Sequence, residues 1–319
     1  TGNGTPECNA RAGGATLYFY THTPGQCNNL GEIPGVAMHE WGHSYDSNDG
    51  SGGQAKPVET YADWTAIIQT HNSCTGAGFY LTGNCSGFGD ACLDCTGVRD
   101  CDWDKHASHT PWTSQNKGTV WGTLNCTGTY YGPCGWGDHC ESGISTQALW
   151  DFVYRDLPAE CGMDLTSAWM LEDRLWFTGV ATMTAAYTCA SAVTNGCGGT
   201  LLYSVMRAMD DDGDGTANGT PHAHAIYHAL HRHLIDCDTW NDSSPQNQNQ
   251  TSCPSLTTPT LSAASGSNQV TLSWTTGGAS ATRYFVYRNE SACDVAFNRI
   301  AIVDAPALSY TDTGVVNGV

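Results

Sequence analysis

The stretch GVAMHEWGHSYDSNDG, residues 35–50, carries two histidines four residues apart, with a glutamate directly after the first. In an α-helix, side chains four positions apart lie on one face, so His39 and His43 can bind one metal ion together. Glu40 lies one step round the helix, where its carboxylate can reach a water on such an ion rather than the ion itself. The stretch therefore predicts a helix over 33–46 with a metal-binding face, although a core helix that happens to carry histidines fits the same letters.

A catalytic zinc ion needs a third protein ligand and one open coordination position. Glu59, 16 residues after His43, opens the segment ETYAD, and Asp63 follows it by one helical turn. An aspartate in that position can accept a hydrogen bond from a ligand histidine. Asp49 is the competing ligand, because some metzincin proteases use a residue six positions after the motif, but Asp46 replaces their bend glycine. The sequence favours Glu59, while an ordinary acidic helix start is the alternative interpretation of ETYAD.

HEWGH followed by ETYAD resembles the HExxH and ExxxD pair of the thermolysin-like and fungalysin-like gluzincin metallopeptidases. Two further segments match in character. HCESGI, residues 139–144, is similar to the family's HxNSGI segment, and CNARAGGATLYFY, residues 8–20, is similar to its Asn-Ala edge strand. The resemblance covers residues 8–155 and implies a zincin-type metallopeptidase domain, mostly helical with an edge strand, that uses a catalytic Zn²⁺.

The resemblance also implies roles for individual residues. In this family the glutamate of HExxH takes a proton from the attacking water, and the histidine of HxNSGI donates a hydrogen bond to the developing oxyanion. The backbone of the edge strand lies against the substrate. Carried onto this chain, the implied residues are Glu40 and His139 for catalysis, His39, His43 and Glu59 for zinc, Asp63 behind the ligands, and Asn9 and Ala10 for substrate.

The chain departs from the family pattern at several positions. Glu141 stands where HxNSGI has its asparagine. The aspartate that orients the oxyanion histidine is missing from its expected place, and Asp138 is only its direct neighbour in the sequence. The arginine that grips the substrate carbonyl has two candidates, Arg99 and Arg155. The β-rich part that precedes the edge strand in these enzymes does not occur in this sequence, which we interpret as a processed or partial chain.

A second motif, DDDGDGTANGTPH at residues 210–222, places carboxylates at alternate positions around glycines. Alternate oxygen ligands on a tight turn converge on one hard cation, as in the first half of an EF-hand loop. Pro221 stands where an EF-hand has its final glutamate, so a complete EF-hand is excluded, and a solvated acidic turn is the alternative. The predicted ligands of a structural Ca²⁺ are Asp210, Asp212, Asp214 and Asn218.

The rest of the first domain reads as mostly helical. Its last expected helix carries His224, His228 and His231 opposite an apolar stripe, and a solvated polar face explains these histidines better than a second metal site does. A strand is expected at 15–20, and further helices at 57–71, 142–155, 165–177 and 221–235.

The composition changes after residue 240. The segment 241–255 is polar and has no periodicity, so it predicts a linker between a metallopeptidase domain at 1–240 and a second domain at 256–319. Alternating apolar runs follow, and they resemble a fibronectin type III domain that stops early at Val319. The predicted fold class is α+β, a zincin domain followed by a partial β-sandwich, with expected strands at 269–274, 283–289 and 299–304.

The charge and apolar runs exclude some partners. The chain has 12 basic and 31 acidic side chains, a net charge of −19, and a nucleic-acid backbone would be repelled by such a surface. No run approaches the ~18 apolar residues that a membrane span needs. We therefore expect protein or peptide substrates, no nucleic acid and no membrane span, with surface, polysaccharide or protein contacts through the second domain.

The 16 cysteines indicate disulfides in a secreted, extracellular protein. The alternative is zinc ribbons, but Cys92 and Cys95 form the only CxxC, and no second one completes a four-cysteine site. Connectivity cannot be deduced from sequence. Short-range pairs are our working guesses, namely Cys74–Cys85, Cys189–Cys197 and Cys237–Cys253.

The sequence thus predicts a secreted zinc endopeptidase that uses Glu40 as its general base. A catalytically silent zincin-fold protein that serves in adhesion or surface assembly is the first alternative; Glu40 and His139 together argue against it, because a scaffold needs neither. A metzincin-type protease with Asp49 as third ligand is the second. Cleavage specificity is not encoded in any motif that we recognise.

Overall fold

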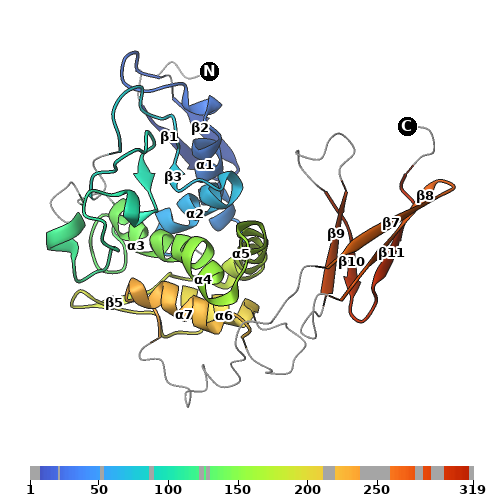
Figure 1. Cartoon of the computed structure of the whole chain (residues 1–319). Coiled ribbons are helices and arrows are strands. Elements are labelled where there is room, and N and C mark those ends of the chain that lie inside the picture. Colours follow the sequence, from blue (N-terminus) through green and yellow to red (C-terminus); the bar gives the residue numbers. More distant parts are fainter. Residues whose placement is uncertain are drawn as a thin grey trace. The chain divides into compact units, whose positions relative to one another are not determined.

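The computed structural model divides into two compact units, Thr1–Ser252 and Cys253–Val319 (Figure 1). The boundary falls within 241–255, the expected linker, which lies outside the described residues. The structure describes residues 8–20, 22–50, 54–85, 90–121, 126, 130–210, 220–237, 259–276, 283–288 and 298–315.

Helices α1 (Pro34–Asp46) and α2 (Val58–Thr70) are consecutive in the sequence, and they pack against each other at the centre of the first unit. Pro34 begins α1, where its missing N–H costs no hydrogen bond. Ten consecutive residues of α2, from Glu59 to Ile68, are buried, so this helix is surrounded on all sides. In Figure 1, α2 lies between α1 and α3, and both helices contact it.

Gly42, inside the HEWGH motif, explains how closely α1 and α2 pack. A Cβ atom at this position would lie 2.8 Å from Cα of Ala62 on α2, closer than real side chains approach. Glycine costs roughly 1 kcal/mol in a helix interior relative to alanine, so its place here reflects the close approach of the two backbones. This contact brings the histidine face of α1 against the first turn of α2.

The other helices of the first unit complete the core. The expected helix at 142–155 begins four residues earlier, as α3, and continues through a π-helical stretch at Phe152–Asp156; α6 was not predicted. The bounds are α3 Asp138–Asp151, α4 Leu157–Cys161, α5 Leu165–Gly179, α6 Leu202–Asp210 and α7 Ala223–Arg232.

Short strands and turns connect these helices. The first hairpin, β1 (Ala10–Gly13) and β2 (Thr16–Phe19), agrees with the strand expected at 15–20 and packs on α1, where Ser44 Oγ donates a hydrogen bond of 2.6 Å to the Gly14 carbonyl. The remaining elements are β3 Cys74–Thr75 paired with β4 Arg99–Asp100, β5 Thr188–Ala190 paired with β6 Val193–Asn195, 3-10 turns at Leu30–Glu32, Trp103–Lys105 and Val180–Thr182, and a π-helical turn at Lys117–Trp121.

The disulfides correct all three pairs that sequence proximity suggested. Cys74 pairs with Cys95 rather than Cys85, Cys189 with Cys134 rather than Cys197, and Cys237 with Cys197 rather than Cys253. Pairing requires Cα atoms about 4.4–6.8 Å apart in the folded chain, which short separation does not ensure. The six pairs among described residues are Cys8–Cys27, Cys74–Cys95, Cys85–Cys92, Cys126–Cys140, Cys134–Cys189 and Cys197–Cys237.

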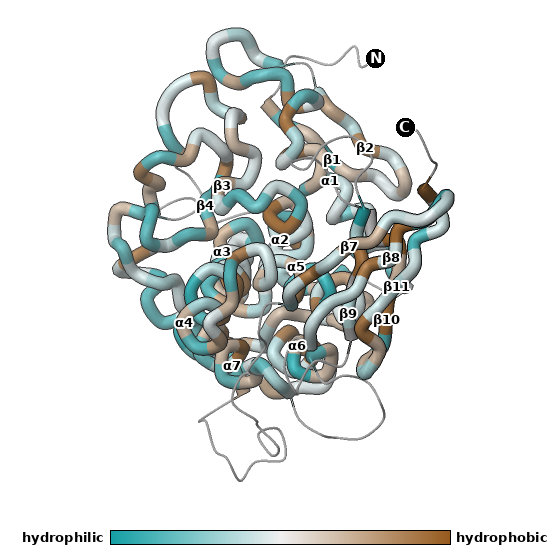
Figure 2. Tube along the Cα trace, turned by 45° about the vertical axis from the view of Figure 1, so that its right-hand side comes forward, coloured by the Kyte–Doolittle hydropathy of each residue, from teal (hydrophilic) through white to brown (hydrophobic). Residues whose placement is uncertain are grey.

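The second unit consists of antiparallel strands. Its three expected strands are present as β8, β9 and β10, and two further strands, β7 and β11, were not predicted. Figure 2 shows apolar residues on β8 and β10, and the ring of Trp274 packs on Tyr284 with centroids 5.4 Å apart. One sheet has the order β11 (Ser309–Asp312), β8 (Gln269–Trp274), β7 (Leu261–Gly266), and the other pairs β9 (Arg283–Arg288) with β10 (Asn298–Asp304).

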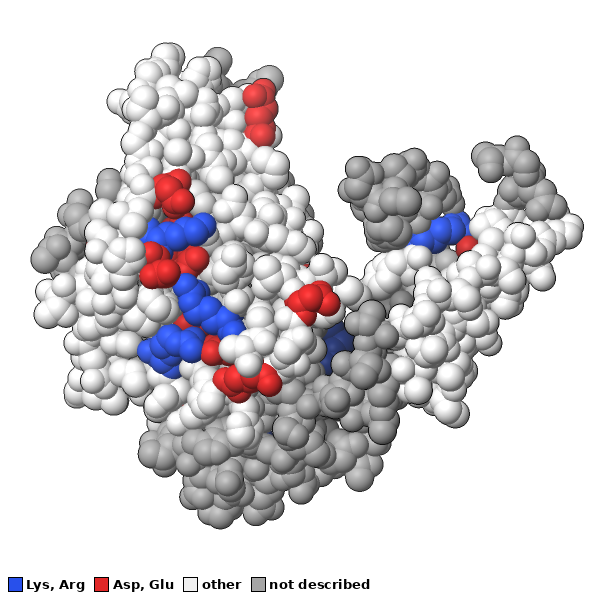
Figure 3. All heavy atoms as spheres, viewed as in Figure 1, with Lys and Arg blue, Asp and Glu red and all other residues white. Residues whose placement is uncertain are grey.

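The chain therefore combines helices with small sheets, which is compatible with the predicted α+β class. On the face shown in Figure 3, Lys and Arg side chains lie interleaved with Asp and Glu side chains, an arrangement typical of ion pairs rather than of a continuous basic patch. None of the described helices is both long enough and apolar enough to cross a membrane.

Candidate metal centre

Three predicted zinc ligands converge at the contact of α1 and α2. His39 Nε2 lies 3.4 Å from Glu59 Oε2, and His43 Nε2 lies 3.5 Å from Glu59 Oε1. One ligand atom from each of the three residues lies within 4.8 Å of the other two. Two imidazoles and a carboxylate are a donor set that suits zinc. These residues therefore fit a divalent metal ion held between two helices.

Asp138 fixes the position of the third ligand. Its Oδ2 accepts a hydrogen bond of 3.1 Å from the backbone N–H of Glu59, at the first turn of α2. Pro57, the residue before α2, provides no side-chain cap, so a carboxylate from α3 serves this helix end instead. The sequence suggested Asp138 only as a neighbour of His139. In the structure, its carboxylate holds the first turn of α2.

A second layer of charged groups lies behind the ligands. Asp63 Oδ1 is 2.8 Å from Nδ1 of His39, the contact expected for an aspartate that orients a ligand histidine. Arg99, on β4, donates from Nε and Nη2 to the two oxygens of Asp63, at 2.7 Å each. The same Nη2 donates to Glu59 Oε2 at 3.1 Å. Arg99 therefore supports two members of the site.

The two arginines considered for substrate binding differ in position. Arg99 lies at the site, but its guanidinium is engaged by Asp63 and Glu59 rather than directed only at a substrate carbonyl. Arg155 forms ion pairs with Asp102 and Asp151 instead. The sequence did not reveal the role of Arg99, because this residue lies on β4, and β4 is placed by its pairing with β3 in the folded chain.

The protonation of the cluster follows from burial and from the contacts among its members. Burial disfavours the charged form of His39, but hydrogen bonds with Asp63 and Glu59 outweigh it and raise the pKa of His39 to about 10. Burial raises the pKa of Glu59, yet its contacts with His39 and His43 lower it well below the usual value. A ligand imidazole is neutral, so metal binding here must release a proton.

The predicted catalytic residues face the same cleft. Glu40 is 6% exposed, and burial raises its pKa, an effect that His39 and His43 partly oppose. His139, on α3, places Nε2 3.2 Å from Glu59 Oε1, and its side chain is 40% exposed. Burial lowers the pKa of His139 below its usual value. The raised pKa makes the Glu40 carboxylate a better proton acceptor, and the lowered pKa favours the neutral His139 imidazole, which can still donate a hydrogen bond.

The cleft at this site has a volume of about 930 Å³. Strand β1 forms one wall of it, and Asn9 and Ala10, the predicted substrate contacts, are among the wall residues. The backbone N–H of Ala10 donates a hydrogen bond of 2.9 Å to Asn9 Oδ1. The residues that line the cleft include Asn9, Ala10, His39, Glu40, His43, Glu59, Arg99, Asp138 and His139.

Other candidates lie elsewhere or have other partners. Asp49 Oδ2 accepts a hydrogen bond of 3.1 Å from the Tyr61 hydroxyl, and it is outside the group of three converging ligands. Glu141 is buried and accepts from the backbone amides of Cys134 and Trp136, so it anchors the loop before α3.

The predicted calcium ligands fall mostly outside the described residues. Three of them, Asp212, Asp214 and Asn218, are not among those residues. Asp210 is described: it is buried, accepts a hydrogen bond from the backbone N–H of His222, and contacts the Nδ1 atom of that ring, both at 2.7 Å. On α7, His228 contacts Glu160 and His231 contacts Asp236. Within the described part of the chain, no group of three metal-ligating side chains forms on α7.

None of the known protein-family models matches this chain, and no curated protein sequence is significantly similar to it. A functional assignment therefore depends on the residues of the site and their geometry.

Proposed function

We propose that this protein is a secreted zinc-dependent endopeptidase of the gluzincin type that hydrolyses peptide bonds in protein or peptide substrates. The observation that carries the proposal is the convergence of His39, His43 and Glu59 at one end of a large cleft. Behind these residues, Asp63 contacts His39 and Arg99 donates hydrogen bonds to Asp63, which is the outer support that metal centres use. The six disulfides among the described residues fit a protein of an oxidising, extracellular environment.

A zinc ion held by these three residues supplies a Lewis acid that lowers the pKa of water and polarises the scissile carbonyl. Glu40, buried beside the ligand histidines, takes a proton from the attacking water and passes it to the leaving amine. His139 donates a hydrogen bond to the carbonyl oxygen as negative charge develops there, an interaction typically worth about 3 kcal/mol. Arg99 and Asp63 hold His39 and Glu59 in place throughout.

The acidic segment 210–218 is proposed as a structural Ca²⁺ site on the basis of its sequence. Calcium must therefore be controlled separately in any chelation experiment, because removing it would affect folding and not chemistry. Loss of activity in a chelator counts as evidence for zinc only when activity returns with zinc in the presence of calcium.

The test combines metal analysis with digestion of casein by the purified protein. We expect about one zinc per chain, hydrolysis that a chelator abolishes, and recovery on adding zinc. Glu40→Gln should retain zinc and lose about 10³-fold in kcat, because only the proton transfer is removed. Normal activity in Glu40→Gln would refute the assignment. Bound zinc without hydrolysis of any substrate would favour the non-catalytic alternative.

A further inference from the structure

Arg11 is a charged residue of the cleft wall that the proposed chemistry does not use. It lies on β1 between Ala10 and Ala12, which are half-buried, while its own side chain is exposed and lines the cleft. In the hairpin it stands opposite Tyr18 on β2. Its guanidinium carbon lies 4.6 Å from the centroid of the Tyr18 ring. This stacking holds the cation at the wall and reduces the conformational entropy that a ligand contact would cost.

The surroundings of Arg11 differ from those of the other arginine in the cleft. Arg99, the other arginine of the cleft, is engaged by Asp63 and Glu59. Among the described residues, no carboxylate forms an ion pair with Arg11. The chain as a whole carries a net charge of −19, so an accessible cation on this wall is a local exception in a strongly acidic protein.

We propose that Arg11 selects substrates that place a carboxylate against β1. This inference rests on the proposed peptidase function and specifies its substrate class. A peptide lying along the edge strand presents side chains at intervals that reach the wall, and a guanidinium binds a carboxylate with two parallel hydrogen bonds. The carboxylate belongs either to an Asp or Glu side chain or to the C-terminus of a short peptide. Both present the same chemistry to Arg11.

The test uses quenched fluorescent peptides of one parent sequence with the full-length zinc-loaded protein. Each of the three residues on either side of the cleaved bond is in turn Glu or Gln, and each peptide is made with a free or an amidated C-terminus. The variants are Arg11→Gln, Arg11→Lys and Arg11→Glu. Lys117→Gln, which removes a cation that lies 5.1 Å from the Trp136 ring centroid and outside the cleft lining, is the matched control for the loss of one ring-stacked positive charge.

We expect the wild type to cleave the Glu peptide about fivefold faster than the Gln peptide, in kcat/KM, at one position, as partly exposed charge pairs allow. Arg11→Gln should abolish that ratio without slowing the Gln peptide, Arg11→Lys should keep part of it, and Arg11→Glu should reverse it. Lys117→Gln should behave as the wild type. A ratio that follows the free C-terminus instead of a Glu residue identifies the terminal carboxylate as the group bound.

Two results would overturn the inference, and they differ. If all proteins cleave the peptides with the same Glu to Gln ratio, Arg11 plays no part in selection, while the peptidase function stands. If neither the wild type nor any variant cleaves any peptide, the peptidase function fails and the role of Arg11 fails with it.

Discussion

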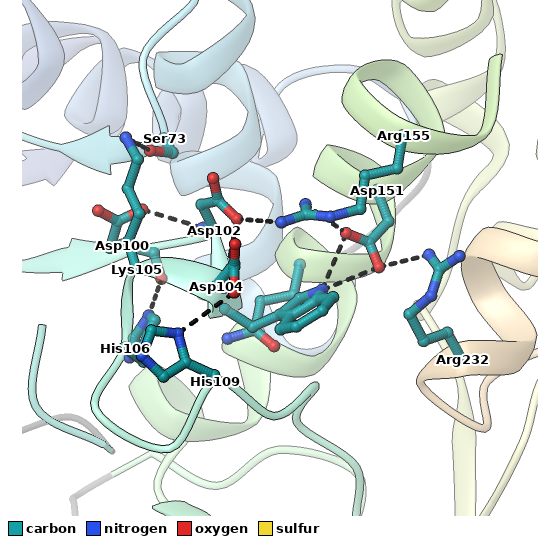
Figure 4. Close-up of polar contacts among 12 residues, drawn as sticks. Ser73, Asp100, Asp102, Asp104, Lys105, His106, His109, Asp151, Arg155 and Arg232 are labelled. Carbon is teal, nitrogen blue, oxygen red and sulfur yellow. Dashed lines mark hydrogen bonds and ion pairs between the residues drawn. The ribbon is translucent and has the colours of Figure 1, made fainter. Parts of the chain in front are cut away.

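Two clusters of charged side chains lie in the first unit, and they differ in what satisfies them. In the cluster of Figure 4, Asp151 accepts hydrogen bonds from Trp103 Nε1 at 3.0 Å, Arg155 Nη1 at 2.7 Å and Arg232 Nη1 at 2.5 Å. His233 Nε2 adds a contact at 3.2 Å. Trp103, Arg155 and Arg232 each donate an N–H group to this carboxylate, so its charge is compensated by side chains of the fold itself.

The cluster of His39, His43 and Glu59 is different because its members compete for protons. When the Nε2 atoms of His39 and His43 carry no proton, these nitrogens and the Glu59 oxygens that they face are all hydrogen-bond acceptors and present lone pairs to one another. The carboxylates of Asp63 and Glu59 raise the pKa of His39 against the effect of burial, so this cluster favours a positive charge between its members. A closed ion-pair cluster stabilises a fold, whereas converging lone pairs beside a cleft indicate a metal site.

The largest expected effect comes from removing the third ligand. Glu59→Ala should weaken zinc binding by roughly 10²–10³-fold, since the 10–16 kcal/mol of a structural zinc site is shared among about four ligands. Competition with a chromophoric chelator measures the affinity. Asp49→Ala is the control and should retain zinc. The opposite pattern would favour the metzincin-type alternative.

The second prediction concerns the closed cluster. Asp151→Ala should lower the free energy of unfolding by about 2–3 kcal/mol, because Arg155, Arg232 and His233 would lose their shared acceptor while the two arginines keep Asp102 and Asp156. Denaturant unfolding monitored by tryptophan fluorescence measures the loss. Zinc affinity of the folded fraction should be unchanged, and a cost below about 1 kcal/mol would contradict the structural role of this cluster.

The third prediction compares one arginine from each cluster. Arg99→Lys keeps the charge but loses the paired contact with Asp63, and zinc affinity should fall about 10-fold or more. Arg155→Lys should leave zinc affinity unchanged and reduce stability. Equal zinc affinity in both variants would mean that Arg99 does not support the ligands.

The smallest effect concerns a buried carboxyl group that belongs to neither cluster. Glu172 accepts one hydrogen bond, from Trp64 Nε1 at 2.8 Å, and burial raises its pKa well above the usual value. The folded protein therefore keeps a proton that the unfolded chain releases above about pH 4, so this group's contribution to stability falls as the pH rises.

Glu172→Gln keeps the acceptor and removes the titration. The free energy of unfolding of the variant should be close to the wild-type value at pH 5. At pH 8 it should be higher than the wild-type value, because only the wild type loses stability as the pH rises. Denaturation midpoints at both pH values measure the difference. Parallel pH profiles of the two proteins would show that Glu172 does not titrate on unfolding.

The sequence predicted most of the elements that carry the site. The helices over 33–46 and 57–71 are α1 and α2 within about two residues at each end, because their patterns are local and recur with the helical period. Asp63 was expected behind His39, and it lies there. The disulfide guesses were wrong, since chain separation says little about which cysteines meet in space.

The sequence by itself determined which residues share a helix face, because the spacing of side chains along a helix is fixed by backbone geometry. Only the tertiary structure decided that Gly42 packs against Ala62, that Asp138 caps α2, and that β4 delivers Arg99 to the ligands. These contacts join segments 20 to 79 residues apart, where packing of the whole core, rather than local backbone preference, selects the partners.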